Sequence, residues 1–249
     1  MNADVGEGFG AYSIGDDEAL MAVLTDVNIA CGFHAGDPSI MRRSVELAVA
    51  RGLGIGAHVG YADLRGFGRR DIDVSPADVY DDTVYQLGAL QAVCTTLGGR
   101  VGYVKPHGAL YHRAWVDAEV ADAVVRAVRD VDSSLALVSP SGSAAEARAG
   151  ELGIRAVAEG YIDRAYLPNG HLAPRSQPGA LVSDPAVAVA QVMRMLTEQS
   201  VLSTSGDVVQ LRAETLCVHS DSPGSARLAG AVRDQLLESG IDVQSFGHE

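Results

Sequence analysis

Short apolar runs alternate with longer segments of helical period along most of the chain. Within each run the apolar residues are consecutive and do not alternate with polar ones, and the runs are rich in β-branched residues or glycine. This pattern is typical of strands that are buried on both faces. We expect strands at residues 27–31, 53–57, 101–104, 135–138, 155–158 and 215–218. Strand–helix alternation of this kind predicts a parallel sheet, either closed as a (β/α) barrel or open and doubly wound.

The segments between the runs carry signals for the start of a helix. A capping oxygen followed by proline at the first helical position favours helix initiation. The pairs with this pattern are Asp37-Pro38, Ser75-Pro76, Asp184-Pro185 and Ser222-Pro223. The segment after Ser75 also carries apolar residues at the helical period from Val79 to Leu97.

Nothing in the sequence marks a linker, so we expect one domain over residues 1–249. Residues 167–181 are irregular and contain several prolines and glycines, which indicates a long loop of the kind that is usually functional. Residues 201–211 have the pattern of a hairpin, and residues 241–246 have that of a last short strand.

The composition narrows the class of protein. The 19 basic and 32 acidic residues give a net charge of −13, which argues against nucleic acid or an anionic membrane as a partner. The chain has only three cysteines, an odd number that cannot all form pairs, so we expect no disulfide framework. The first residues lack the pattern of a signal peptide. No stretch reaches the ~18 apolar residues of a membrane helix. We therefore expect a soluble, cytoplasmic protein.

Ionisable residues follow most of the predicted strands. They are His34; His58 with Asp63; Lys105 and His107; Glu159 with Asp163 and Arg164; and His219 with Asp221. Asp4 and Glu7 fit the same scheme if a short first strand precedes them. Because parallel strands end on one side of a sheet, these groups should converge on one mouth. An unpaired buried polar group costs ~1–3 kcal/mol, a cost that a reaction site would explain.

Lys105 is the only lysine in the chain, which otherwise uses arginine as its cation. A lysine at a strand end suggests that either a compact ammonium or an amine with a tunable pKa is needed there. Arg69 and Arg70 either clamp an anion or form a solvated pair, and Asp4, His34 and His58 are candidate ligands for a divalent metal. We expect Asp37 to cap a helix, Cys31 and Cys217 to lie in the core, and His112, His171 and His248 to lie on the surface.

Several motifs together resemble the LamB/YcsF family, which provides the A subunit of the prokaryotic ATP-dependent 5-oxoprolinase. They lie at residues 2–10, 28–37, 56–63, 66–70, 104–111, 159–166, 170–175 and 217–221, in family order. The resemblance implies a seven-stranded (β/α) TIM-like barrel of the glycoside hydrolase/deacetylase type. It also implies hydrolysis of 5-oxo-L-proline to L-glutamate with ATP as co-substrate, accompanied by Mg²⁺, and with separate B and C subunits as partners.

On this hypothesis ATP converts the lactam oxygen into a phosphate leaving group. The expected catalytic residues are Asp4, Glu7, His34, His58, Lys105 and His107. The expected substrate-binding residues are Asp63, Arg69, Arg70, Glu159, Asp163, Arg164, His219 and Asp221. Lys105 would stabilise charge on the oxygen or phosphate, one histidine would activate water, and Arg164 would hold the substrate carboxylate.

Two alternatives remain open from the sequence. One is a metal-dependent deacetylase or other amidohydrolase that acts alone, and the other is a non-catalytic subunit that binds the substrate or holds its partners. The chain also begins directly at its first motif, so we expect either a truncated chain or a frayed first strand of the barrel.

Overall fold

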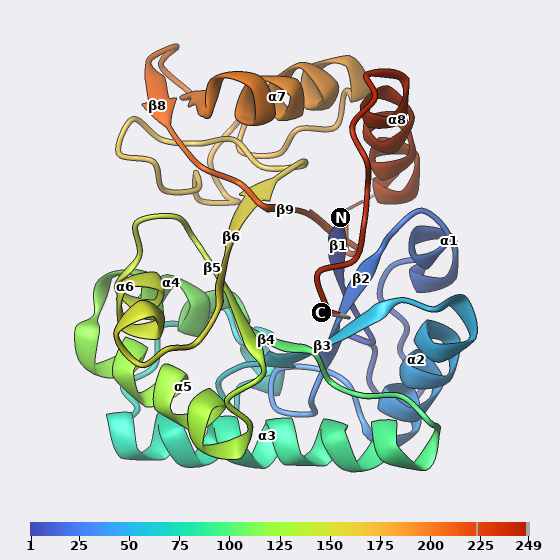
Figure 1. Ribbon diagram of the computed structural model, residues 1–249, viewed down its shortest axis with the longest axis vertical. Helices are drawn as coiled ribbons and strands as arrows, with labels where there is room; N and C mark the ends of the chain where they lie inside the picture. Colours follow the sequence, from blue (N-terminus) through green and yellow to red (C-terminus); the bar gives the residue numbers. More distant parts are fainter. Residues whose placement is uncertain (223, 248–249) are drawn as a thin grey trace.

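Seven parallel strands close into a barrel in this computed structural model, which describes residues 1–222 and 224–247 (Figure 1). The strands are β1 (Asn2–Val5), β2 (Asp26–Ala30), β3 (Gly54–Val59), β4 (Tyr103–Pro106), β5 (Ala136–Ser139), β6 (Ala156–Tyr161) and β9 (Thr215–His219). Each strand pairs with the next in this order, and β9 closes the barrel by pairing with both β6 and β1. The closed barrel confirms the predicted fold class.

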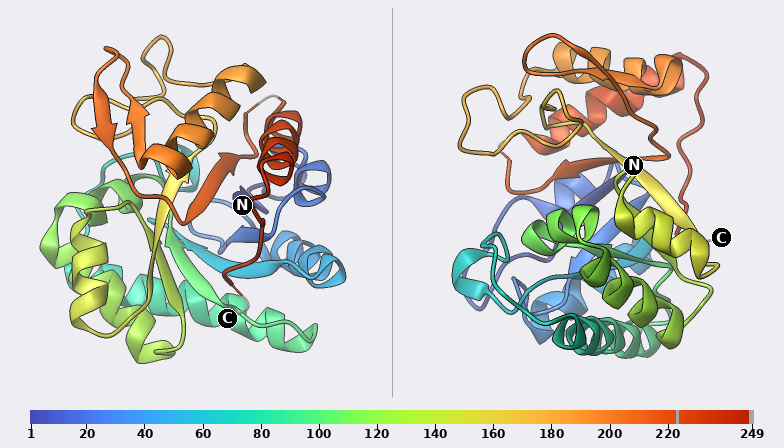
Figure 2. Two further views of the ribbon diagram at one scale, coloured as in Figure 1. Left: turned by 45° about the horizontal axis from the view of Figure 1, so that its top comes forward. Right: turned by 90° about the vertical axis from the view of Figure 1, so that its left-hand side faces the viewer.

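Helices surround the barrel on its outer side (Figures 1 and 2). They are α1 (Asp17–Met21), α2 (Pro38–Arg51), α3 (Pro76–Thr96), α4 (Gly108–Val116), α5 (Ala118–Val131), α6 (Ala144–Glu151), α7 (Pro185–Glu198) and α8 (Ser225–Glu238). A short 3₁₀ turn, η1 (Leu64–Gly66), follows β3. Within the described ranges no helix combines the length and the apolar character needed to cross a membrane.

Three of the four predicted helix caps are confirmed. Asp37, Ser75 and Asp184 accept hydrogen bonds from the first backbone N–H groups of α2, α3 and α7. The fourth prediction is wrong, because α8 begins at Ser225 after Gly224, which offers no capping side chain. The Ser222 hydroxyl instead donates to Asp163 at 3.5 Å, and Pro223 lies outside the described residues.

The first strand is formed by the opening motif itself, so the expectation of a frayed strand is wrong. Residues of β1 pair with β2 at four positions and with β9 at three. Asn2 and Asp4 are buried within this strand. Their polar side chains interrupt the kind of apolar run that predicts the other strands from the sequence.

Several strands also extend further toward the mouth than the apolar runs do. His58, Lys105 and Glu159 are the residues that the pattern places just after a strand, and they lie inside β3, β4 and β6. All three are buried. A polar residue at a strand's carboxyl end therefore makes the strand look shorter in the sequence than it is.

The other end of the barrel is closed by the last described residues of the chain. Phe246 packs on Tyr103 with ring centroids 4.6 Å apart, and the Gly247 N–H and the Ser245 hydroxyl donate to the Asp26 carboxylate. The strand predicted at residues 241–246, all of which are described, does not form, because here the chain bonds to a side chain instead of a neighbouring strand. Inside the barrel a Cβ on Gly56 would lie 2.1 Å from the Tyr103 ring, so the ring occupies the space that any larger residue would need.

The excursion between β6 and β9 agrees with the sequence pattern. The predicted hairpin is formed by β7 (Ser200–Leu202) and β8 (Val208–Gln210), which pair in antiparallel fashion. The predicted loop at residues 167–181 contains turns and isolated bridges in place of a regular element. Its middle part, from His171 to Arg175, lines the cavity described below.

Candidate active site

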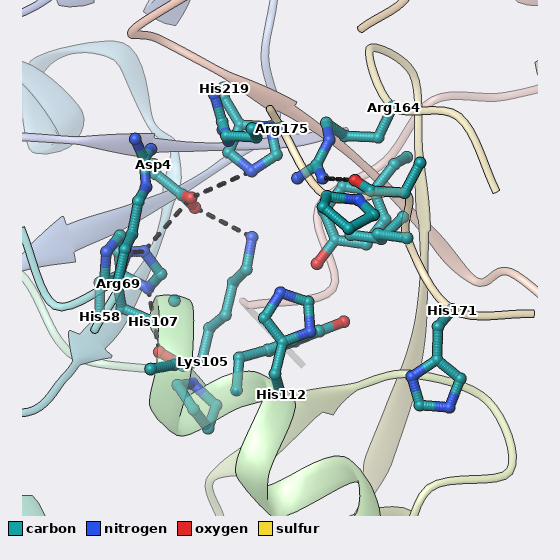
Figure 3. A pocket seen from close by; sticks show the side chains of 18 residues that line it. Asp4, His58, Arg69, Lys105, His107, His112, Arg164, His171, Arg175 and His219 are labelled. Carbon is teal, nitrogen blue, oxygen red and sulfur yellow. Dashed lines mark hydrogen bonds and ion pairs between the residues drawn. The ribbon is translucent and has the colours of Figure 1, made fainter. Parts of the chain in front are cut away.

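A cavity of about 470 Å³ lies at the carboxyl ends of the strands (Figure 3), within the range of about 300–1,000 Å³ typical of small-molecule sites. The ionisable side chains that line it are Asp4, His58, Arg69, Lys105, His107, His112, Arg164, His171, Arg175 and His219. They come from β1, β3, β4 and β9, from α4 and the residue before it, and from the two loops that follow η1 and β6. The predicted convergence of strand-end groups at one mouth is confirmed for six of these residues, namely Asp4, His58, Lys105, His107, Arg164 and His219.

Lys105 lies at the centre of what we call the lysine cluster: Asp4, Lys105, Glu159 and Cys217. The ammonium nitrogen Nζ is 2.9 Å from Asp4 Oδ1, 2.9 Å from Glu159 Oε1 and 3.1 Å from Cys217 Sγ. Burial on its own lowers the pKa of Lys105, but Asp4, Cys217 and Glu159 outweigh it and raise that pKa well above its usual value. This direction favours the compact ammonium over the amine with a tunable pKa.

The carboxylate of Asp4 is held as an anion by its neighbours. Burial alone raises the pKa of Asp4, but His58 and Lys105 bring it well below the usual value. Asn28 Nδ2 also donates to Asp4 Oδ1 at 2.8 Å. In turn the Tyr161 hydroxyl donates to Glu159 Oε2 at 2.7 Å. Both carboxylates beside Lys105 thus have further donors, and the buried charges of the cluster are compensated.

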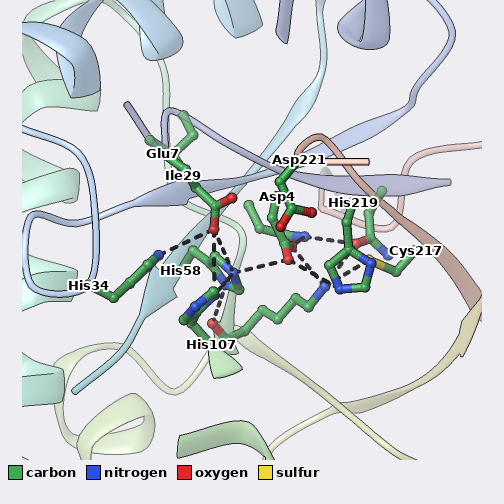
Figure 4. Close-up of polar contacts among 12 residues, drawn as sticks. Asp4, Glu7, Ile29, His34, His58, His107, Cys217, His219 and Asp221 are labelled. Atoms are coloured by element: carbon green, nitrogen blue, oxygen red, sulfur yellow. Dashed lines mark hydrogen bonds and ion pairs between the residues drawn. The ribbon is translucent and has the colours of Figure 1, made fainter. Parts of the chain in front are cut away.

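A second group, the histidine cluster, consists of Glu7, His34, His58 and His107 (Figure 4). Glu7 Oε1 lies 3.5 Å from His34 Nε2, 3.5 Å from His107 Nδ1 and 3.9 Å from His58 Nε2. His107 Nδ1 and His58 Nε2 are 2.9 Å apart, and the His34 and His107 rings stack at 3.8 Å. All four side chains are buried.

Backbone contacts fix the orientation of two of these rings. His58 Nδ1 lies 3.0 Å from the backbone oxygen of Lys105, and His107 Nε2 lies 2.8 Å from that of Phe67. Burial lowers the pKa of His34 and of His107 well below the usual value, so both rings are neutral near pH 7. Burial, helped by the Asp4 charge, raises the pKa of Glu7 well above its usual value.

Asp163 and His219 form an oriented pair at the edge of the lysine cluster. His219 Nδ1 is 2.9 Å from Asp163 Oδ2, and the His219 backbone N–H donates to the same oxygen at 3.1 Å. The other ring nitrogen, Nε2, lies 4.0 Å from Asp4 Oδ2. Burial alone raises the pKa of Asp163, but His219 outweighs it and brings that pKa below its usual value. The pair therefore leaves Nε2 as the proton-accepting nitrogen of His219.

Three arginines complete the lining of the cavity. Arg69 binds Asp221 at 2.7 Å, and Arg175 lies 3.3 Å from both oxygens of the same carboxylate. Arg164 is 5 % exposed and donates from one terminal nitrogen to the backbone oxygen of Ala173 at 2.6 Å. Its Nε has no hydrogen-bond partner among the described residues. Arg164 thus has one unused donor, which is enclosed by protein atoms.

Five predicted substrate-binding residues do not line this cavity: Asp63, Arg70, Glu159, Asp163 and Asp221. Of these, Glu159, Asp163 and Asp221 contact the lining residues Lys105, His219 and Arg69. The predicted catalytic residues Glu7 and His34 do not line the cavity either.

Arg70 forms an ion pair with Asp63, whose Oδ1 also accepts from the Gly66 N–H at 2.9 Å. This pair closes the turn at η1 and so positions the neighbouring Arg69. The proposed metal ligands are also divided: His34 and His58 group with Glu7 and His107, whereas Asp4 groups with Cys217 and His219.

Some residues of the site escaped the sequence analysis. Cys217 was expected to be a plain core residue, and its sulfur contacts Lys105. His112 and His171, expected at the surface, line the cavity as well, and His171 stacks on Trp115 at 4.2 Å. Arg175 was noted in the sequence only as the last residue of the family motif at residues 170–175. His171 and Arg175 belong to the loop predicted to be functional, which was their one signal in the sequence; His248 lies outside the described residues.

Comparisons with known proteins agree with this architecture. A sequence model of the LamB/YcsF family matches residues 1–249. A Nocardia farcinica (strain IFM 10152) protein, named as the A subunit of 5-oxoprolinase, is 49% identical over 246 residues, covering 99% of this chain and 98% of that protein. A Mycobacterium leprae (strain Br4923) protein of the same name is 48% identical with the same coverage.

Solved structures agree on the fold. The crystal structure of a lactam utilization protein from Thermus thermophilus has a TM-score of 0.92 and 43% identity, and the match covers 99% of this chain and 98% of that one. A putative cellobiose-phosphate cleavage protein from Enterococcus faecalis V583 has a TM-score of 0.56 at 14% identity, with 99% and 96% covered. The second likeness concerns the fold alone.

Proposed function

The chain belongs to the LamB/YcsF family, and from this premise we propose that it binds 5-oxo-L-proline at the mouth of its barrel and takes part in the ATP-dependent opening of the lactam ring to L-glutamate. It would do so as the A subunit of a 5-oxoprolinase that also contains B and C subunits. The names of the relatives support the substrate and the role within a larger enzyme.

The observation that carries the proposal is the charge of the cavity. The chain as a whole has a net charge of −13. Among the described residues, however, the cavity is lined by Arg69, Lys105, Arg164 and Arg175 and by a single carboxylate, that of Asp4. Three of these cations are paired: Lys105 with Asp4 and Glu159, and Arg69 and Arg175 with Asp221. Arg164 has no ion pair among the described residues, and a buried cation of this kind favours an anionic ligand. 5-Oxoproline carries a carboxylate, and activation by ATP would add a phosphoryl group.

Arg164 is the residue best suited to the substrate carboxylate. It is buried, it lines the cavity, and its Nε lacks a partner within the part of the chain that the structure describes. A guanidinium binds a carboxylate through parallel hydrogen bonds that also orient it. Binding at Arg164 would fix one end of the lactam and leave the amide bond to face the other groups of the cavity.

Lys105 would stabilise negative charge on the lactam oxygen or on a phosphate attached to it. Its ammonium already contacts two carboxylates and a thiol. A thiol sulfur is a weak acceptor, so the contact with Cys217 is the one that a substrate oxygen would most readily replace. The two carboxylates would hold the ammonium in place during that exchange.

His219 is the proposed general base. Asp163 accepts from Nδ1 and thereby leaves Nε2 free to take a proton from water. His34, His58 and His107, the bases proposed from the sequence, direct their inner nitrogens at one another and at Glu7. The role of base therefore passes to His219 in this proposal.

A coupled assay of phosphate release and glutamate formation, with and without the B and C subunits, tests the function. We expect both products only when 5-oxo-L-proline, ATP and all subunits are present. The Arg164→Gln variant should raise KM for 5-oxo-L-proline at least about tenfold, since a charged hydrogen bond contributes about 1.5–3 kcal/mol. The control is Arg42→Gln, because Arg42 lies on the outer helix α2, where it pairs with Glu46.

The same assay separates the alternatives. Glutamate formed by this chain alone without ATP would contradict the proposal and favour an independent amidohydrolase. Full turnover by a His219→Gln variant in the complex would contradict the assignment of the base. Full turnover by Arg164→Gln as well would favour a subunit that only holds its partners.

A further inference from the structure

We propose that Glu7, His34, His58 and His107 bind a divalent transition-metal ion, with Zn²⁺ as the best match, beside the substrate cavity. The inference goes beyond the proposed function, since it concerns a metal site and makes no use of the substrate. It rests on the spacing of the donor atoms, the orientation of the rings and the unpartnered atoms of the histidine cluster.

The spacing of the four donor atoms suits one small cation. Each residue offers one nitrogen or oxygen, and the four atoms all lie within 4.8 Å of one another. A tetrahedral ion with ligands at about 2.0–2.1 Å needs neighbouring donors about 3.3 Å apart. The distances of 3.5 Å from Glu7 Oε1 to His34 and to His107 and of 2.9 Å between His107 and His58 lie on either side of that value.

The backbone contacts make the outer nitrogens of two rings the donors. A backbone oxygen only accepts, so His58 Nδ1 must donate to Lys105 O and His107 Nε2 must donate to Phe67 O. The inner nitrogens, His107 Nδ1 and His58 Nε2, face each other at 2.9 Å, and His58 Nε2 also lies 3.3 Å from Asp4 Oδ2. A cation among these two nitrogens and Glu7 Oε1 would take all three atoms as ligands. Histidines that ligate metals typically donate their outer N–H to a carbonyl in this way.

The third histidine and the carboxylate lack other partners in the described part of the chain. Neither ring nitrogen of His34 nor Glu7 Oε1 has a hydrogen-bond partner there, although both residues are at most 3 % exposed. Atoms of this kind carry a desolvation penalty that a bound partner would relieve. A bound cation would satisfy Glu7 and one nitrogen of His34 together. Asp4, in contrast, is already bound by Lys105 and Asn28.

The backbone around the rings is shaped to bring them together. Gly68 has φ +63°, and a Cβ there would lie 2.6 Å from His34 Cβ and 2.8 Å from His107 Cδ2. A Cβ on Gly60 would lie 2.7 Å from His34 Nδ1. Both glycines therefore allow the loops to close on the stacked rings of His34 and His107, and this close approach keeps the donors in place.

The donor set selects the class of metal. Three imidazoles and one carboxylate suit Zn²⁺ and its first-row neighbours, whereas Mg²⁺ and Ca²⁺ prefer oxygen ligands. His58 and His107 also line the cavity, so an ion held by them would lie next to the space assigned to the substrate.

Titration of untagged, chelator-treated protein with Zn²⁺, followed by calorimetry, tests the site in the absence of 5-oxo-L-proline and ATP. We expect one ion per chain, no competition from Mg²⁺, and a visible Co²⁺ spectrum typical of a low-coordinate site. Glu7→Gln and His34→Ala should each weaken Zn²⁺ binding at least about tenfold. His112→Ala should leave binding unchanged, because His112 lines the same cavity outside the cluster.

Absence of Zn²⁺ binding by the wild-type chain would overturn the proposal and leave a shared proton as the link between the rings. Binding that survives both Glu7→Gln and His34→Ala would place the ion elsewhere and overturn it equally. Because metal content is measured without substrate, a chain that binds Zn²⁺ and fails in the coupled assay would contradict the proposed function alone.

Discussion

The two clusters at the barrel mouth use buried charge in opposite ways. In the lysine cluster, the ammonium of Lys105 lies within 3.1 Å of two carboxylates and a thiol, and the carboxylates have further donors of their own. In the histidine cluster, two ring nitrogens face each other at 2.9 Å, and Glu7 Oε1 and both His34 nitrogens lack hydrogen-bond partners among the described residues. Every charged group of the lysine cluster lies within 2.9 Å of an opposite charge, whereas several buried polar atoms of the histidine cluster have no such partner.

This difference separates the contributions of the two clusters to stability and to function. A complete buried ion pair becomes strongly destabilising only when one partner is removed. An incomplete polar cluster destabilises the fold already and is explained by what it binds. We therefore expect substitutions in the lysine cluster to affect folding and substitutions in the histidine cluster to affect ligand binding.

The largest effect is expected for Lys105→Met. The variant would leave Asp4 and Glu159 as buried carboxylates without their counter-ion, which should lower the free energy of unfolding by about 3–5 kcal/mol. Urea denaturation monitored by circular dichroism measures the change. Arg42→Met on the outer helix α2 is the control and should change stability by less than about 0.5 kcal/mol. A loss for Lys105→Met as small as that of the control would contradict the description of the lysine cluster.

A smaller effect is expected for Asp163→Asn. This variant tests whether the pair of Asp163 and His219, like the lysine cluster, loses stability when one partner is changed. The wild-type pKa of Asp163 is lowered mainly by His219 against the effect of burial. Its stabilising contribution is therefore present above the unfolded pKa of about 3.8 and is lost as the pH falls through the lower folded pKa. We expect the variant to be less stable by about 1–3 kcal/mol at pH 7.

Denaturation curves of wild type and Asp163→Asn between pH 7 and pH 2.5 check this prediction. The difference between the two proteins should shrink below about pH 3.8, where the wild-type carboxylate of the unfolded chain becomes protonated. A difference that grows as the pH falls would show that the sign of the shift is wrong.

The smallest effect on stability is expected for His34→Leu in the metal-free protein. This substitution replaces two buried nitrogens, unpartnered among the described residues, with an apolar group, so the free energy of unfolding should change by less than about 1 kcal/mol. Thermal denaturation with and without Zn²⁺ should show stabilisation of the wild type by the ion and none of the variant. A decrease of more than about 3 kcal/mol in the free energy of unfolding without metal would mean that the polar atoms of the histidine cluster already have partners in the metal-free protein.

The apolar runs and capped helices are local patterns, and they predicted a parallel sheet that could be closed or open; the closed seven-stranded barrel was implied by the family resemblance. The sequence pattern placed the ends of β3, β4 and β6 too early, because His58, Lys105 and Glu159 are polar residues inside strands. It missed the regular pairing of β1 for the same reason, since Asn2 and Asp4 break the apolar run. Polar residues within a barrel strand thus make that strand harder to recognise from the sequence.

Part of the cavity lining was predictable from strand ends, namely Asp4, His58, Lys105, His107 and His219, whereas the partition of the ionisable residues into clusters was not. Lys105 and Asp4 are 101 positions apart, and His219 and Asp163 are 56 apart, so their pairing depends on barrel closure and register. The role of Cys217 depends equally on the side chain opposite it. The separation of Asp63 and Arg70 from the cavity follows from the local turn at η1, which uses both of them.

The most direct test of the central claim is a crystal structure of the chain grown with saturating 5-oxo-L-proline. The account predicts the lactam inside the cavity at the carboxyl ends of the strands, with its carboxylate on Arg164 and its ring oxygen toward Lys105. A cavity that stays free of ligand, or a ligand bound with its carboxylate away from Arg164, would contradict the claim that this mouth is a substrate site.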